Sequence, residues 1–227
     1  MIFLILLLNL IMLRYYQRIA KIIKVYDYPL SKRKIHKAKT PLIGGVMLLA
    51  NIMFINSVYF FFNDFYFNDL NKIFGDSNKY FVFLFSSSII FLIGYVDDKK
   101  NLNANLKFFL FFLTIVLSIH LDPNLLLETI VIKSWNININ LFKFGSFFTV
   151  VCFLLFINAA NMYDGINLQS GPYFFGVYSY LLYQYGMNSF FVMILIFLTI
   201  FCLLNAKGKI FFGNSGIYFI SFMTSYI

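Results

Sequence analysis

The feature that most constrains the fold is a series of eight apolar runs separated by polar segments. The runs cover Ile2–Leu13, Leu42–Phe62, Tyr80–Val96, Leu106–Leu121, Phe144–Ile157, Pro172–Tyr185, Ser189–Leu204 and Ile217–Ile227. A helix needs roughly 20 apolar residues to cross a bilayer, and a chain that is 61% hydrophobic and 12% charged is too apolar for a soluble domain. We therefore predict an all-α, polytopic membrane helical bundle with about eight transmembrane segments. It forms one domain over residues 1–227, which we expect to be incomplete at its C-terminus because the last run reaches the final residue.

The basic residues are distributed unevenly between the two sides of the predicted bundle. With the N-terminus outside, loops 14–41, 97–105, 158–171 and 205–216 face the cytoplasm. Together with Lys107, at the start of the next run, they contain 14 of the 18 Lys and Arg residues. This excess follows the positive-inside rule. The net charge of +9 requires no nucleic-acid partner, because anionic lipids and phosphate substrates explain it equally well.

Two of the loops have amphipathic patterns of their own. Residues Arg14–Asp27 place apolar and basic side chains on opposite faces of a helix, which predicts an amphipathic helix at the inner membrane surface. In the outer loop 122–143, apolar residues from Trp135 to Leu141 alternate with asparagines, which predicts a short external β-hairpin. We assign this hairpin a structural role.

Two adjacent carboxylates, Asp97 and Asp98, stand where the third apolar run ends, in the segment GYVDDKKN. Neighbouring carboxylates repel each other unless something positive lies between them, and ionisable groups at a membrane boundary are costly unless they are solvated, paired or bound to an ion. A divalent metal or a basic substrate pocket would satisfy both conditions. The alternative is that the pair only ends a helix and faces water.

The fifth run leads into the segment NAANMYDGIN, in which Asn158, Asn161 and Asp164 are spaced three residues apart. On a helix this spacing places the three side chains along one face. Oxygen-bearing groups on one stripe before a glycine turn suit a phosphate-bound cation or a sugar nucleotide. The alternative is a polar helix end that hydrogen-bonds its own carbonyl groups, which the regular spacing disfavours.

Glycine-containing segments precede two further runs on the cytoplasmic side. In HKAKTPLIGG, the pair Gly44–Gly45 allows a backbone or a ligand to approach closely. In KIFFGNSG, the residues Gly213–Gly216 come directly before the last run, so free N–H groups at that helix start could meet an anion. Taken alone, this second motif is weak.

Together these four segments resemble those of the polyprenyl-phosphate N-acetylhexosamine-1-phosphate transferases, which form glycosyltransferase family 4. The family includes phospho-N-acetylmuramoyl-pentapeptide transferase and the enzymes that start O-antigen and teichoic-acid synthesis. The resemblance covers nearly all of the chain. It implies a multi-pass enzyme of the bacterial inner membrane whose active site faces the cytoplasm. Such an enzyme uses Mg²⁺ to transfer N-acetylhexosamine-1-phosphate from a UDP-sugar to undecaprenyl phosphate and releases UMP. The product starts a lipid-linked cell-envelope glycan such as O-antigen, and a homodimer is left open.

The resemblance also assigns roles to individual residues. It implies catalytic roles for Asp97, Asp98 and Asp164, with one of the Asp pair deprotonating or orienting the lipid phosphate. It implies nucleotide or phosphate contacts for a further set of residues, with Phe211 packing on uracil: Asn158, Asn161, Asn205, Phe211, Lys39 and Lys107. The implied metal ligands are Asp98, Asp164 and Asn214.

Three departures from the family pattern open an alternative. Asn167 and Asn214 stand where the family often has Asp, and a neutral amide adds no charge to a metal site. The family also has a histidine-rich inner loop that helps to choose the sugar. That loop follows further spans, and this sequence stops before them. These departures favour a second hypothesis, a catalytically silent homologue or fragment that binds lipid or partner proteins. A small-molecule transporter ranks lower, because its charged or glycine-broken positions would lie at mid-membrane.

Overall fold

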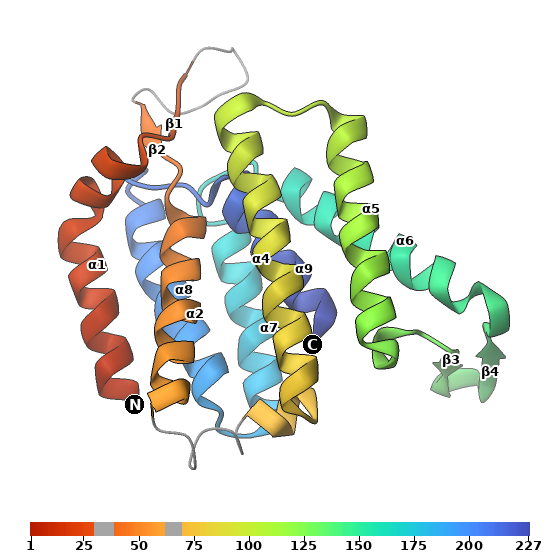
Figure 1. The fold of residues 1–227 in the computed structure, drawn as a ribbon. Coiled ribbons are helices and arrows are strands. Elements are labelled where there is room, and N and C mark those ends of the chain that lie inside the picture. Colours follow the sequence, from red (N-terminus) through yellow and green to blue (C-terminus); the bar gives the residue numbers. More distant parts are fainter. Residues whose placement is uncertain (30–38, 62–69) are drawn as a thin grey trace.

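The computed structural model describes residues 1–29, 39–61 and 70–227. Within these residues it contains eight α-helices of 14 to 24 residues, which form a bundle (Figure 1). The helices are α1 (Ile2–Ile23), α2 (Gly44–Phe61), α4 (Ser77–Lys100), α5 (Ala104–Leu121), α6 (Gly145–Tyr163), α7 (Ser170–Tyr185), α8 (Ser189–Asn205) and α9 (Gly213–Tyr226). Each of the eight predicted apolar runs forms one of these helices, so the prediction of a helical membrane bundle is confirmed.

Five segments of the described chain are long and apolar enough to cross a membrane. They are α1, α2, α4, α5 and the stretch Phe142–Tyr163, which contains α6. Helix α8 is apolar but shorter. Large apolar side chains remain exposed on the outside of the bundle, among them Leu10, Phe112 and Leu155. Helices of this length with apolar outer faces suit a lipid environment, and the protein is a multi-pass membrane protein.

Helix α1 is longer than the first apolar run. The predicted amphipathic stretch Arg14–Asp27 is helical as far as Ile23, as the continuation of α1. Its predicted end at Asp27 is wrong, because α1 is capped by Lys24, which has a left-handed backbone. The chain then enters strand β1 (Tyr26–Asp27), which pairs antiparallel with β2 (Thr40–Pro41). Residues 30–38 of the predicted cytoplasmic loop 14–41, and residues 62–69 after α2, lie outside the described residues.

Helix α9 lies inside the bundle and packs against α2, α4 and α6. All of its residues from Ser215 to Met223 are buried. The predicted close approach at Gly44–Gly45 is confirmed, because a Cβ atom on Gly45 would lie only 2.4 Å from the backbone nitrogen of Gly216. The missing side chains let the first turns of α2 and α9 meet backbone to backbone.

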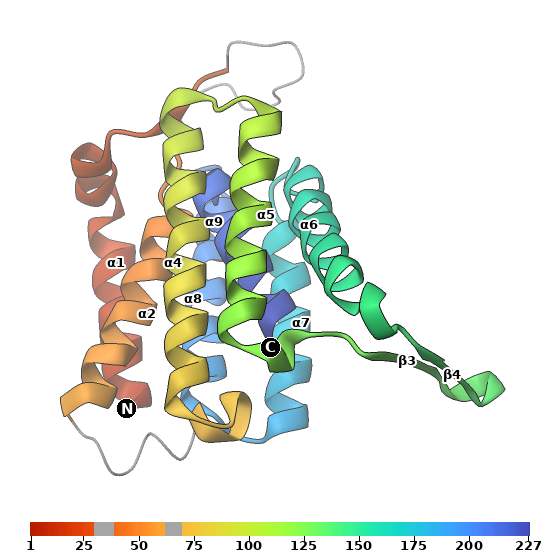
Figure 2. The ribbon, with the colours of Figure 1, turned by 45° about the vertical axis from the view of Figure 1, so that its right-hand side comes forward.

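A β-hairpin joins α5 to α6, as predicted from the alternating sequence. Its strands are β3 (Thr129–Ile132) and β4 (Ile137–Asn140), which pair antiparallel. Three short 3₁₀ turns flank or connect them: η1 (Pro123–Leu125), η2 (Lys133–Trp135) and η3 (Phe142–Phe144). The hairpin projects sideways from the bundle (Figure 2).

The loops that were predicted to share one side of the membrane meet at one end of the bundle. The β1–β2 segment and the α4–α5 turn mark this end in Figure 1, and the hairpin and the N-terminus lie at the other. The end of strand β2 and the start of α2 join the α8–α9 loop through two backbone hydrogen bonds, from Phe211 to the carbonyl of Pro41 and from Gly44 to the carbonyl of Phe211, each 3.0 Å long. These hydrogen bonds hold the start of α2 against the loop that leads into α9.

Candidate functional site

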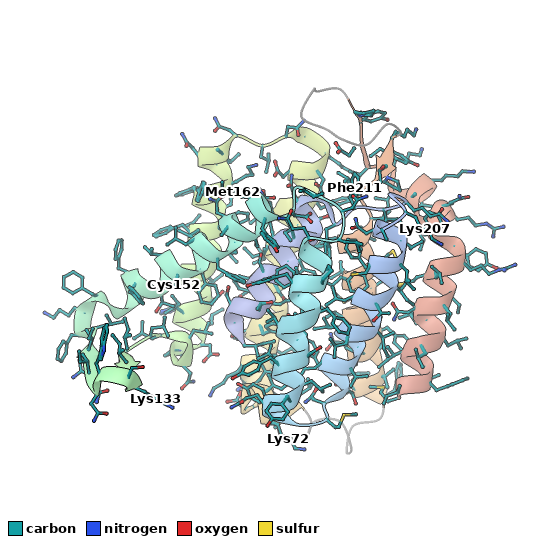
Figure 3. All side chains as sticks on the ribbon, turned by 180° about the vertical axis from the view of Figure 1, so that it is seen from behind. Lys72, Lys133, Cys152, Met162, Lys207 and Phe211 are labelled. Carbon is teal, nitrogen blue, oxygen red and sulfur yellow. The ribbon has the colours of Figure 1, made fainter. Side chains whose placement is uncertain are left out.

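A cavity of about 660 Å³ opens at the end of the bundle where these loops meet. Its wall is polar and aromatic: it includes the carboxylates of Asp27, Asp98 and Asp164, the amides of Asn101, Asn161, Asn167, Asn205 and Asn214, and the rings of Tyr26, Tyr28, Phe211 and Phe212. Figure 3 places Met162, Phe211 and Lys207 at this end of the molecule, with Lys72 and Lys133 at the other. The volume lies within the usual range for small-molecule sites, roughly 300–1,000 Å³.

Asp98 reaches from the last turn of α4 to the start of α9. One of its carboxylate oxygens accepts a hydrogen bond from the backbone N–H of Asn214 (2.7 Å), and the other accepts one from the N–H of Ser215 (2.9 Å). The negative charge also lies at the positive end of the α9 dipole. The free N–H groups that the sequence led us to expect before the last run therefore meet an anion, which is the side chain of Asp98. These contacts fix the carboxylate in the cavity wall.

Asp97 faces the interior rather than the cavity. It is 1% exposed and forms an ion pair with Lys107, with 3.0 Å between Nζ and Oδ2. It also accepts hydrogen bonds from the backbone N–H of Leu102 (2.8 Å), the Asn214 amide (2.8 Å) and the Tyr218 hydroxyl (3.2 Å). A buried carboxylate with four donors is fully satisfied, so its contacts are those of a structural anchor between α4, α5 and α9.

Asp164 directly follows α6 and lines the same cavity as Asp98 at the end of α4. The Ser170 hydroxyl donates a hydrogen bond to its carboxylate. The pKa of Asp164 is raised to about 6, mainly by burial and also by the charge of nearby Asp98, against the lowering effect of the Ser170 hydrogen bond. Two carboxylates that share one cavity in this way favour a cation between them.

The two asparagines of the α6 motif have different positions. Asn161 lines the cavity, whereas the amide of Asn158 donates to the sulfur of Met162 at 3.8 Å and is not part of the cavity wall. The structure thus brings Asn161 and Asp164 together with Asp98, and leaves Asn158 one turn away. The role that the resemblance implies for Asn158 remains a prediction.

Asn205, at the end of α8, joins two of the loops that build the cavity. Its side-chain oxygen accepts a hydrogen bond from the N–H of Leu168 (2.8 Å), and its amide donates to the carbonyl of Ile210 (3.0 Å). It is 6% exposed, and both the oxygen and the nitrogen of its side-chain amide form hydrogen bonds. Asn205 therefore holds the α6–α7 turn against the α8–α9 loop and contributes an edge to the cavity.

The two lysines predicted to contact phosphates lie in different environments. Lys107 is paired with Asp97 and does not line the cavity. Lys39 is exposed, and its ammonium group lies 4.3 Å from the centre of the Tyr26 ring and 5.8 Å from that of Tyr28. Because both rings belong to the cavity wall, Lys39 lies close to the cavity.

The Tyr26–Tyr28 stretch was not among the residues predicted to form the site. It brings two aromatic rings and the third carboxylate, Asp27, into the cavity wall through the β1–β2 pairing. The available signal was an acidic residue between two tyrosines in a predicted cytoplasmic loop. The predicted amphipathic helix included Tyr26 and Asp27, whereas α1 ends at Ile23.

The oxygen-rich wall of the cavity fits a magnesium ion. Mg²⁺ is bound by carboxylate and carbonyl oxygens, and in phosphate-transferring enzymes it takes one or two carboxylates and completes its shell with water and substrate phosphates. Within the described residues, no group of three or more His, Cys, Asp or Glu side chains is arranged to hold a metal. Asp98 and Asp164 would therefore hold the ion together with phosphate, and the oxygen of Asn214 is a further donor because only its amide nitrogen is used by Asp97.

The fold and the cavity define a multi-pass membrane protein with an acidic, amide-rich site at one end of its helices. The sequence model of glycosyl transferase family 4 matches residues 80–227, well over half of the chain. The protein belongs to this family. The matched region includes Asp98, Asp164 and Asn214, whereas Asp27 precedes it. No individual curated protein matches the chain.

Proposed function

We propose that the protein transfers N-acetylhexosamine-1-phosphate from a UDP-sugar to undecaprenyl phosphate and releases UMP. Membership of glycosyl transferase family 4 supports transfer of a glycosyl-1-phosphate to a lipid carrier in general. The observation that carries the finer proposal is the cavity, in which Asp98 from the last turn of α4 and Asn161 and Asp164 from the end of α6 line one space. The product would start a lipid-linked cell-envelope glycan such as O-antigen.

The reaction is an attack by one phosphate on another. An oxygen of the lipid phosphate bonds to the phosphorus that carries the sugar, the bond from that phosphorus to the bridging oxygen breaks, and UMP leaves with that oxygen. Several negative charges come together, so catalysis consists mainly of positioning and charge neutralisation. When bound, Mg²⁺ supplies positive charge to the phosphate oxygens.

The chain's own residues provide the remaining parts of the mechanism. Asp98, held by two backbone N–H groups of α9, has the orientation of a fixed carboxylate that can place a cation or accept a proton from the lipid phosphate. Asp164, with a pKa of about 6, is the second candidate for that proton. Phe211 offers an aromatic surface for uracil, and Lys39 lies close enough to the cavity wall to meet a phosphate.

The charge distribution supports an orientation for this site. The loops that form the cavity end contain most of the basic residues of the chain. By the positive-inside rule this end faces the cytoplasm, where UDP-sugars are found. We place the protein in the bacterial inner membrane, and a homodimer is left open.

The second candidate is a catalytically silent homologue that binds lipid or partner proteins. One observation favours it: Asn214, in the cavity wall, is neutral and its amide nitrogen is engaged by Asp97, and a neutral side chain adds no negative charge to the metal site. Asn167, also in the cavity wall, is equally neutral.

Release of UMP distinguishes the two candidates. The assay uses membranes that contain the chain, undecaprenyl phosphate and a panel of UDP-sugars beginning with UDP-N-acetylglucosamine, with and without Mg²⁺. The transferase proposal expects release that requires both the lipid and Mg²⁺. No release with any donor, from protein shown to be folded, would favour the silent homologue.

A further inference from the structure

The β3–β4 hairpin is strongly two-sided. In an antiparallel pair, residues directly opposite each other point to the same face of the sheet. The register pairs Ile130 with Ile139 and Ile132 with Ile137, and it pairs Thr129 with Asn140 and Val131 with Asn138. One face therefore consists of four isoleucines, and the other is mostly threonine and asparagine.

Further exposed apolar groups lie beside the strands in the chain. Trp135, in the turn between the strands, is 74% exposed, and Phe142 and Phe144, between the hairpin and α6, are 82% and 74% exposed. The strands themselves contain no charged residue, and Lys133 and Lys143 flank them. Several large exposed apolar groups within one short segment indicate an interaction surface.

The position of the hairpin indicates what this surface contacts. It joins two membrane-spanning helices through short connections, from Leu121 to Thr129 and from Asn140 to Gly145, so it cannot move far from the level at which α5 ends and α6 begins. Figure 2 shows it extending sideways from the bundle at that level. An amphipathic element held there lies beside the bilayer surface.

The chemistry of the hairpin limits how deeply it can enter the bilayer. A two-stranded hairpin leaves backbone N–H and C=O groups unpaired along its outer edges, and such groups are not tolerated in the hydrocarbon core. Tryptophan and lysine are the residues that favour the headgroup region, with the ring at the interface and the ammonium group directed to water. Apolar side chains at this depth can enter the acyl region while the polar face remains hydrated.

We propose that the β3–β4 hairpin is a membrane anchor, which lays its isoleucine face and Trp135 into the headgroup–acyl boundary of the leaflet opposite the cavity. The partner is the lipid bilayer itself. Since the hairpin leads directly into α6, the anchor fixes the far end of the helix that carries Asn161 and precedes Asp164. This inference does not depend on the proposed transferase reaction.

Trp135 is the only tryptophan of the chain, so its fluorescence reports the hairpin without any substitution. The protein is reconstituted at one copy per lipid nanodisc, with lipids brominated near the headgroup or near the chain end, and excited where tyrosine does not absorb. We expect loss of Trp135 fluorescence with shallow bromines, a smaller loss with deep bromines, and protection from aqueous iodide.

Three results would overturn the proposal. Quenching by iodide but not by brominated lipid would place Trp135 in water. Protection from both quenchers would mean that another part of the same chain covers the hairpin. Stronger quenching by deep than by shallow bromines would contradict the interfacial depth.

A pair of matched variants tests the isoleucine face directly. The double substitution Ile137→Asn with Ile139→Asn removes apolar contact from that face, and we expect weaker quenching by brominated lipid and more by iodide. The control, Asn138→Ser with Asn140→Ser, changes the same strand on the opposite face and should leave both signals unchanged. Equal effects of the two variants would refute the assignment of the faces.

Discussion

Replacing Lys107 by Met tests whether this lysine serves Asp97 or a substrate phosphate. Lys107 has a 23% exposed side chain and pairs at 3.0 Å with a carboxylate that is 1% exposed. The methionine fills much of the same space but leaves the Asp97 charge without its counter-ion. Removing one partner of a buried ion pair costs about 3–5 kcal/mol.

The contacts that remain set the expected magnitude. Asp97 keeps the hydrogen bonds from Leu102, Asn214 and Tyr218, and Lys107 is partly solvated, so we expect the lower end of that range, about 3 kcal/mol. For a chain of this size, 1 kcal/mol lowers the melting temperature by about 2–4 °C, so Lys107→Met should lower it by roughly 6–12 °C.

A companion substitution makes the test specific. Asp97→Asn removes the buried charge, and the Asn214 amide can turn so that its oxygen accepts from the new side chain. We expect this single variant to cost about 1 kcal/mol, and the double variant to be more stable than Lys107→Met alone, because neither charge is then left unpaired.

The assay is thermal unfolding of purified protein in one detergent, with the four forms of the double-mutant cycle measured side by side. If Lys107→Met leaves the melting temperature unchanged while transfer is lost, the lysine contacts substrate and the structural reasoning is refuted. A double variant that is no more stable than Lys107→Met would also refute it.

Two further predictions concern the cavity, and a third concerns the packing of α2 against α9. Asp98→Asn should lower transfer by at least about 100-fold, as expected for a lost acid–base or metal-holding group, while the protein still elutes as a folded species; retained activity would contradict the role of Asp98. Asn214→Asp should lower the Mg²⁺ concentration needed for half-maximal UMP release, because it adds charge at a position that reaches the site; an unchanged titration would show that residue 214 is not a ligand. Gly216→Ala should cost about 1–3 kcal/mol of stability, because the new Cβ atom would lie 2.8 Å from the backbone nitrogen of Gly45; a melting temperature equal to that of the wild type would contradict the close packing of α2 and α9.

The sequence was sufficient for the helices because an apolar run of membrane length has few alternatives. It was less reliable at their ends. Helix α4 continues through Asp97 and Asp98 to Lys100, and α1 continues through Arg14 to Ile23, because charged residues at a membrane boundary extend a helix as readily as they end it. Hydropathy records where the apolar run stops, and the backbone hydrogen bonds decide where the helix stops.

The cavity could be predicted in part. The motifs identified Asp98, Asn161 and Asp164, which line the same cavity, because the C-terminal ends of α4 and α6 lie at the same end of the bundle. Sequence could not separate Asp97 from Asp98, since adjacent helical residues point about 100° apart and only the packing of α5 and α9 decides which one is buried. It also missed Asp27, because a strand pairing between Tyr26–Asp27 and Thr40–Pro41 carries no hydropathy signal.

The central claim is that this chain forms a lipid-linked sugar diphosphate at the cavity that contains Asp98 and Asp164. Its most direct test is mass spectrometry of the lipid extracted after incubation of the purified protein with undecaprenyl phosphate, a UDP-N-acetylhexosamine and Mg²⁺. We predict a lipid heavier than undecaprenyl phosphate by one N-acetylhexosamine phosphate, present with the wild-type protein and absent with Asp98→Asn and Asp164→Asn. Unchanged undecaprenyl phosphate with the folded wild-type protein and every UDP-N-acetylhexosamine, or equal product from all three proteins, would contradict the account.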